Sequence, residues 1–132
     1  MKKELKQMTG NDITSLTAFF EKDNNVVFAL LFGSHAIKKA NKKSDVDVGV
    51  YFKHPLGGME ILDYSTELTN LINKDVDLVV LNNASPLLRH QIMKHGIRLV
   101  VKDRQQFIKF REDTIRLYQD YKYLNYLEIY DR

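Results

Sequence analysis

Four short runs of β-branched and aromatic residues alternate with stretches of helical spacing, and this alternation limits the possible folds more than any other feature. The predicted strands are Val26–Phe32, Val46–Phe52, Asp75–Leu81 and Ile97–Val101. Alternating strands and helices indicate an α/β (α+β) protein. We expect a small mixed sheet of about four strands, backed by helices on one side.

The segments between and after these strands carry the helical patterns. Ile13, Leu16 and Phe20 predict a first helix, with Asn11 or Asp12 as its N-cap. Gly96 is expected to stop a helix that has Pro86 in its first turn. The other predicted helices are a short one over 34–39, one from about Met59 to Asn73 with an apolar stripe of Ile61, Leu62, Leu68, Leu71 and Ile72, and a long helix or helical pair over 104–130.

Length and composition restrict the class of protein. A chain of 132 residues is long enough for one domain, so we expect a single unit over 1–132 with a C-terminal helical segment over 104–132. No apolar run is long enough to span a bilayer, and the absence of cysteine agrees with a cytoplasmic protein. The net charge of +3 is too small to predict direct nucleic-acid binding.

Three aspartates provide the first sign of chemistry. Residues at i and i+2 of a strand share a face, so Asp45 and Asp47 project together while Val46 and Val48 point into the core. If the second and third strands are neighbours, Asp77 joins them. Three clustered carboxylates suit Mg²⁺, which prefers hard oxygen ligands and is often coordinated by protein carboxylates and substrate phosphates together. The alternative is that Asp45 only caps a turn and Asp47 faces solvent.

A Gly-Ser pair at the end of the first strand supplies the second sign. Gly33 permits close approach of the backbone, and Ser34 offers a hydroxyl and an N–H at the start of a helix, where a phosphate is favoured. Ten residues separate Ser34 from Asp45. Together the three aspartates and the Gly-Ser pair have the layout of a two-metal phosphoryl-transfer site.

Four lysines, at 38, 39, 42 and 43 in the sequence KKANKK, lie between the Gly-Ser pair and Asp45. They are either a solvated loop or a positive rim that attracts a nucleoside triphosphate. The four histidines lack the spacing of a metal site, although His35 is adjacent to Ser34. The tyrosines of RLYQDYKYLNYLEIY are predicted either to pack on the sheet or to face a partner, since tyrosine is enriched in interfaces.

The stretch GSHAIKKANKKSDVDVGV resembles the signature of the polymerase-β-type nucleotidyltransferases, and the short chain resembles their minimal nucleotidyltransferase (MNT) branch. The segment beginning PLLRHQIMKHGIRLVV is similar to the C-terminal half of MNT antitoxins that are paired with a HEPN ribonuclease toxin. The resemblance implies that Gly33 and Ser34 contact the nucleotide phosphates. It also implies that Asp45 and Asp47 bind two Mg²⁺ ions and that Asp77 activates the acceptor.

The activity implied by the resemblance is transfer of AMP from ATP to a tyrosine of the toxin, in a hetero-oligomer of antitoxin and toxin. The chain departs from the family at one place, because Ile37 and Lys38 stand where an Arg-Gly pair is common. Lys38 and Lys39 are the candidates to replace that arginine as point charges. The departure leaves open an antitoxin that acts by binding alone. A small-molecule nucleotidyltransferase would need an additional domain.

Overall fold

The computed structural model describes residues 9–33 and 46–130, and these residues form four α-helices and one four-stranded sheet. Most elements lie within one or two residues of their predicted bounds. In chain order they are α1 (Gly10–Lys22), β1 (Val26–Phe32), β2 (Val46–Phe52), α2 (Gly58–Ile72), β3 (Val76–Val80), the 3₁₀ turn η2 (Leu81–Asn83), α3 (Pro86–His95), β4 (Ile97–Val101) and α4 (Arg104–Tyr130).

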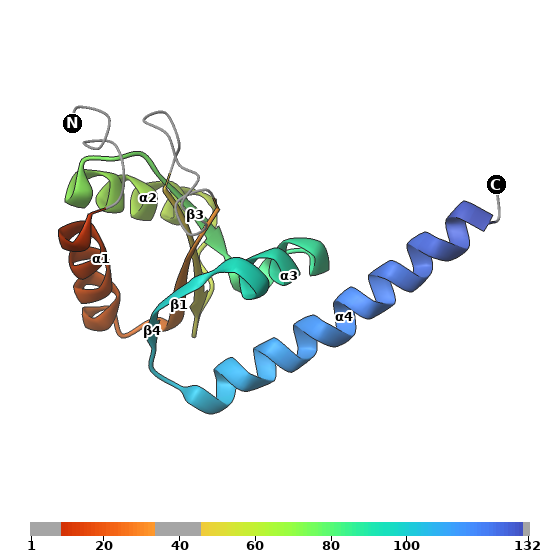
Figure 1. The fold of residues 1–132 in the computed structure, drawn as a ribbon. Coiled ribbons are helices and arrows are strands. Elements are labelled where there is room, and N and C mark those ends of the chain that lie inside the picture. Colours follow the sequence, from red (N-terminus) through yellow and green to blue (C-terminus); the bar gives the residue numbers. More distant parts are fainter. Residues whose placement is uncertain (1–8, 34–45, 131–132) are drawn as a thin grey trace.

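The sheet is mixed, with the strand order β3-β2-β1-β4 (Figure 1). The central strand β1 is antiparallel to both β2 and β4, whereas β2 and β3 are parallel. The predicted mixed sheet of about four strands is therefore confirmed. Among the described residues β3 and β4 are the edge strands, and β3 is the neighbour of β2 that the acidic pattern required.

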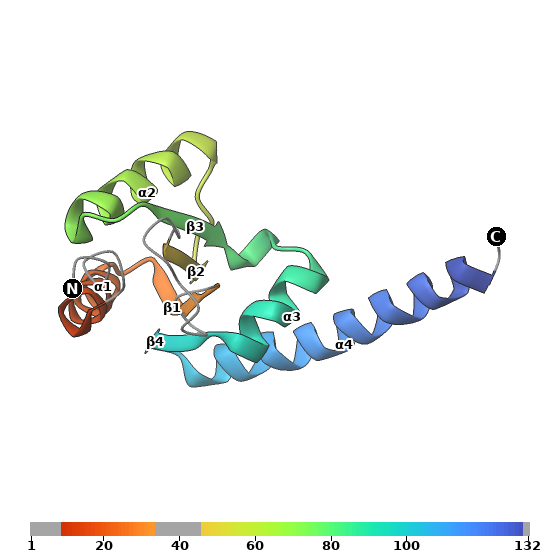
Figure 2. The ribbon, with the colours of Figure 1, turned by 45° about the horizontal axis from the view of Figure 1, so that its top comes forward.

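The helices cover both sides of the sheet, so the expectation of helices on one side only is wrong. Leu16 of α1 and Leu68 of α2 belong to one buried cluster, and Ile92 of α3 and Phe107 of α4 belong to a second one. Figures 1 and 2 show these pairs of helices on opposite sides. The cause is visible in β1, where every residue except Phe32 is buried, as expected of a strand covered on both faces.

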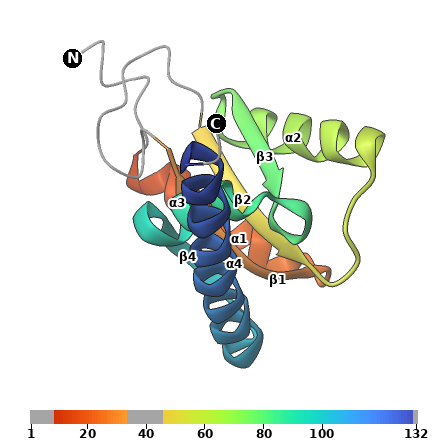
Figure 3. The same cartoon turned by 90° about the vertical axis from the view of Figure 1, so that its right-hand side faces the viewer.

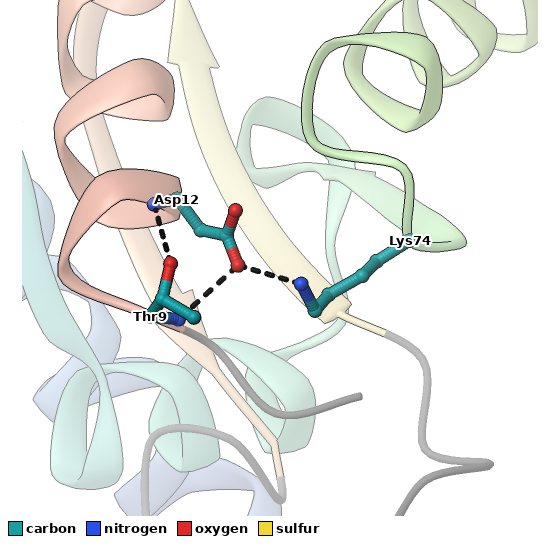
Figure 4. Close-up of polar contacts among 3 residues, drawn as sticks. All are labelled: Thr9, Asp12 and Lys74. Atoms are coloured by element: carbon teal, nitrogen blue, oxygen red, sulfur yellow. Dashed lines mark hydrogen bonds and ion pairs between the residues drawn. The ribbon is translucent and has the colours of Figure 1, made fainter. Parts of the chain in front are cut away.

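Helix α1 begins two or three residues earlier than predicted. Its N-cap is Thr9, and Asp12 is the third helical residue of a capping box, so neither Asn11 nor Asp12 is the cap. Thr9 N donates to Asp12 Oδ2, and Asp12 N donates to Thr9 Oγ1, both at 3.1 Å. Asp12 also forms an ion pair of 2.7 Å with Lys74, which precedes β3 (Figure 4). The contacts among Thr9, Asp12 and Lys74 therefore connect the start of α1 to the residues that lead into β3.

Helices α2 and α3 have the predicted bounds within about one residue. Leu68 and Ile72 are buried as expected, but Leu62 and Leu71 of the predicted stripe are 59% and 41% exposed. The stripe is narrower because α2 packs at the edge of the sheet, over β3 and against α1. Helix α3 starts after the N-cap Ser85 and ends before Gly96, both as the sequence indicates.

Helix α4 is one continuous helix of 27 residues, which decides between the two predicted forms. Its buried residues are Phe107, Phe110 and Thr114. Tyr118 still contacts α3, where its ring stacks on His90 with 3.6 Å between centroids. Beyond that contact the helix leaves the body of the protein (Figure 1). The prediction that the later tyrosines pack on the sheet is therefore wrong. None of the helices in the described parts of the chain is both long and apolar enough to cross a membrane.

Candidate functional site

Strand β2 directs Asp47 to the side of the sheet that carries α3 and α4. Val46 and Val48 are fully buried in the cluster on the α1 and α2 side, as predicted. Side chains alternate along a strand, so Asp47 points to the opposite side, in one row with Gly49 and Tyr51. Tyr51 packs against the α3 and α4 cluster, which confirms the direction of this row.

Asp77 lies directly beside Asp47 on the neighbouring strand. The parallel register of β2 and β3 pairs Asp47 with Asp77, and Val46 N donates to Asp75 O at 2.8 Å where the ladder begins. Adjacent strands are about 4.8 Å apart, so paired residues project side by side on one face. Asp47 is half-buried and Asp77 is exposed. The structure thus brings two of the three predicted carboxylates together.

Gly33 closes the site from the end of β1. Its φ of +79° belongs to the left-handed region, which favours glycine. A Cβ at this position would overlap Oδ2 of Asp47, because Phe32 is paired with Asp47 in the register of β1 and β2. The sequence predicted close approach at Gly33, but not that the approaching group is the Asp47 carboxylate. The pairing of β1 with β2 creates this contact, and no local pattern contains it.

The remaining predicted site residues lie outside the described part of the chain. These are Ser34, Lys38, Lys39 and Asp45, together with the short helix expected over 34–39. Among residues 9–33 and 46–130, no three acidic or histidine side chains group into a possible metal site. The third predicted carboxylate, Asp45, directly precedes β2 in the sequence and lies outside the described residues.

The electrostatics of the described pair favour a cation. Two carboxylates at adjacent positions of one face repel each other, and a divalent ion between them removes that repulsion. Asp77 is open to solvent, so a ligand can reach this end of the sheet. The arrangement can therefore hold a hard cation against a phosphate that approaches from the α3 and α4 side.

A groove that sequence reasoning missed borders the same end of β3. It has a volume of about 680 Å³ and lies between α2 and the open edge of β3. Its lining includes Leu62, Ser65, Thr66 and Leu78, and it reaches Asp77. The available signal was the pair of hydroxyl residues at 65 and 66, which interrupts the apolar stripe expected for α2.

Comparison with known proteins agrees with this geometry. The model of the family described as polymerase beta, nucleotidyltransferase matches residues 14–105, a range that contains Gly33, Asp47 and Asp77. The chain belongs to the polymerase beta nucleotidyltransferase family. The family prediction is thereby confirmed, and the paired aspartates lie within its matched region.

Relatives of this nucleotidyltransferase include the protein adenylyltransferase MntA of Shewanella oneidensis, which is 30% identical over 89 residues, 67% of this chain and 63% of that protein. A chain in the crystal structure of a toxin-antitoxin with AMP-PNP superposes with a TM-score of 0.79 at 27% identity, covering 94% of this chain and 98% of that chain. A chain in the structure of a tri-AMPylated Shewanella oneidensis HEPN toxin with its MNT antitoxin has a TM-score of 0.77 at 24% identity, with the same coverage. That third likeness shows the shared fold.

Proposed function

We propose that this nucleotidyltransferase moves AMP from ATP to a tyrosine hydroxyl of a HEPN-type ribonuclease toxin, and so acts as its antitoxin. The observation that carries the proposal is the register of β2 and β3, which pairs Asp47 with Asp77 beside the left-handed Gly33. The 30% identical protein adenylyltransferase and the similar chain in a toxin-antitoxin structure with AMP-PNP support the choice of reaction and partner.

The carboxylates fit Mg²⁺. Asp47 and Asp77 present hard oxygen donors side by side on one face, and Asp45 is proposed as the third ligand. Two ions at these three carboxylates would match the two-metal arrangement of phosphoryl transfer. When bound, Mg²⁺ neutralises charge on the triphosphate and makes a coordinated hydroxyl more acidic.

The nucleotide is proposed to bind at the end of β1. Gly33 has no side chain that would keep a phosphate from the backbone, and the hydroxyl and N–H of Ser34 would bind phosphate oxygens. Lys38 and Lys39 would supply the positive charge that an arginine gives in other family members, but as point charges without the bidentate geometry of a guanidinium. The Asp47 carboxylate, held against Gly33, would keep the triphosphate and the acidic cluster adjacent.

Asp77 is assigned to the acceptor. A tyrosine hydroxyl has an ordinary pKa of about 10, so it must lose its proton to attack at neutral pH. In the proposed step Asp77 accepts that proton, and the phenolate oxygen bonds to the α-phosphorus of ATP. The bond from the α-phosphorus to the bridging oxygen breaks, and pyrophosphate leaves with the electron pair. The exposed position of Asp77 leaves room for an acceptor side chain.

The domain organisation, the compartment and the assembly of the protein are proposed on the same grounds. We propose one nucleotidyltransferase domain over 1–132, with 104–132 as its C-terminal helical segment. We further propose that the chain works in the cytoplasm as a hetero-oligomer with the toxin. The absence of cysteine is consistent with that compartment.

The test uses Asp77→Asn, with Asp63→Asn as a matched control. Asp63 is another exposed aspartate, but it lies on α2 and does not line the groove that reaches Asp77. Each protein is incubated with ATP, Mg²⁺ and a purified HEPN-type ribonuclease toxin. The mass and the ribonuclease activity of that protein are then measured.

We expect the parent and Asp63→Asn to add AMP and silence the ribonuclease, while Asp77→Asn loses at least about 100-fold in transfer rate. Calorimetry should show that Asp77→Asn still binds ATP with Mg²⁺. If the parent silences the ribonuclease without any gain in mass, the antitoxin acts by binding alone and the proposed transfer is wrong.

A further inference from the structure

The last ten residues of α4, Tyr121–Tyr130, form an apolar surface that we call the distal segment. Seven of these ten residues are large and apolar or aromatic, and all seven are exposed. The exposed fraction is 62% for Tyr123, 55% for Tyr126 and 71% for Tyr130. A helix that is apolar on most sides is normally buried. Something other than solvent is therefore expected around the distal segment.

The described part of this chain does not cover the segment. The buried residues of α4 are Phe107, Phe110 and Thr114, and Figures 1 and 2 show the helix extending away from the body after them. Tyr123, Tyr126, Leu127 and Tyr130 recur at the spacing i, i+3, i+4 and i+7, which makes one stripe. At about 100° per residue, this stripe lies on roughly the opposite side of α4 from the buried residues. Bending α4 onto its own body would leave the stripe exposed.

The distal segment projects on the side of the sheet to which the carboxylates point. Asp47 and Asp77 face the side that carries α3 and α4. Figure 3, viewed from the direction in which α4 points, shows its end in front of α3 and β2. A partner that binds the distal segment and extends toward the sheet would lie before the two carboxylates.

We propose that the distal segment is the docking surface for the toxin, and that it holds the acceptor protein in front of Asp47 and Asp77. The identity of the partner rests on the proposed function. A specific interface buries about 800 Å² per partner, and each aromatic side chain contributes at most about 150 to 250 Å². Three half-exposed tyrosines and one leucine fall short of that area.

This shortfall favours the toxin over a second copy of the chain. Two copies that cross at a stripe of two helical turns would bury little beyond the stripe itself. A folded partner seated on the stripe and against the sheet adds the missing area. The similar chain in the toxin-antitoxin structure with AMP-PNP aligns over 94% of this chain, a share too large to omit all of α4.

The experiment compares two matched pairs of substitutions. Tyr123→Glu with Tyr126→Glu charges the distal segment. Met59→Glu with Leu71→Glu is the control, because both residues are exposed apolar side chains of α2, 72% and 41% exposed, and neither lines the groove beside Asp77. Binding to a purified HEPN-type ribonuclease toxin is measured by calorimetry. ATP binding with Mg²⁺, AMP transfer over a range of toxin concentrations, and sedimentation of each protein alone are measured in parallel.

We expect the distal pair to weaken toxin binding at least about 100-fold, as for central interface residues, and the control pair to stay within about threefold of the parent. ATP binding should be unchanged, and the loss in transfer should appear in the KM for toxin. Loss of toxin binding in the distal pair supports docking even if the parent transfers no AMP, in which case only the proposed reaction fails. Unchanged toxin affinity in the distal pair overturns the docking proposal, whether or not AMP is transferred. A dimer of the parent that the distal pair dissociates, with toxin affinity unchanged, assigns the segment to a second copy.

Discussion

The first half of α4 and its distal segment both carry aromatic side chains, but those side chains have opposite surroundings. In the first half, the rings of Phe107 and Phe110 lie 5.0 and 5.3 Å from the ring of Phe28, and both phenylalanines are at most 5% exposed. In the distal segment every large apolar residue is exposed. An aromatic helix is therefore not by itself evidence of a core in its own chain. The difference teaches that the first half serves this fold, whereas the second half has a surface suited to another protein.

The first half also has cationic neighbours that the distal segment lacks among the described residues. The guanidinium of Arg98 lies 4.5 Å from the ring centre of Phe107, and that of Arg89 lies 4.7 Å from Phe110. Arg89 also donates to the carbonyl oxygens of Asn82 and Ala84, which ties η2 to the start of α3. The attachment of α4 to the body is thus both apolar and polar.

The largest expected effect is the loss of a buried ring in the first half. Phe107→Ala should lower the free energy of unfolding by about 3 to 5 kcal/mol, because it leaves a cavity beside Phe28. Tyr123→Ala, at an exposed position, should change it by less than about 0.5 kcal/mol. Urea denaturation of both variants measures the contrast. Equal losses would mean that the distal segment is also part of the fold.

Gly33→Ala tests whether the candidate site at the end of β1 also contributes to the stability of the fold, as the first half of α4 does. We expect a loss of about 1 to 3 kcal/mol, since alanine is strained at a φ of +79° and its Cβ would displace the Asp47 carboxylate. Gly58→Ala is the control, because nothing lies within 4 Å of a Cβ there. Thermal unfolding measures both. A Gly33→Ala protein as stable as the parent would contradict the close contact with Asp47.

Hydrogen exchange should separate the two halves without any substitution. Amides of the first half should open only with free energies near that of global unfolding. Amides after Tyr121 should have opening free energies below about 2 kcal/mol, because no packing in the described part of this chain holds them. Adding the toxin should slow exchange in the distal segment more than in the first half. Strong protection there in the protein alone would remove the contrast.

The smallest effect is expected at the junction between the halves, where His90 stacks on Tyr118. Burial, followed by the charges of Lys94, Lys122 and His95, lowers the pKa of His90 below its ordinary value of 6.5. The folded state thus favours the neutral imidazole, and its contribution to stability is present above pH 6.5 and declines as the pH falls below it. Unfolding between pH 7.5 and 5 should show this decline in the parent and lose part of it in His90→Gln. An identical pH profile in both would contradict the role of His90.

The sequence predicted the elements better than their arrangement. The bounds of β1, β2 and β4 were correct because short apolar runs end at turn residues, which is local information. The N-cap Thr9 was missed because Asn11 and Asp12, which are also favoured N-cap residues, follow it within three positions. Exposure of Leu62 and Leu71 could not be predicted, since it depends on where α2 meets the sheet. The second helical layer was missed because an unbroken apolar strand was not read as one covered on both faces.

The candidate site was predicted in part, and for a physical reason. The acidic pattern predicted that Asp47 and Asp77 would meet if their strands were neighbours, and the parallel register satisfies that condition. Strand order is a property of the whole chain, so it could only be stated as a condition. The contact of Gly33 with Asp47 depends on the pairing of β1 with β2, which is also non-local.

The stack of His90 on Tyr118 acquires a mechanical meaning from its place on α4. The helix is held on one side of this point and projects on the other, which makes the stack a fulcrum and the rest of α4 a lever arm. The 12 residues from Gln119 to Tyr130 extend about 18 Å at a rise of about 1.5 Å per residue. A tilt of about 10° at the fulcrum would move the tip of the arm by about 3 Å. A protein bound at that tip would move relative to Asp47 and Asp77 by about one hydrogen-bond length, while the sheet itself stayed in place.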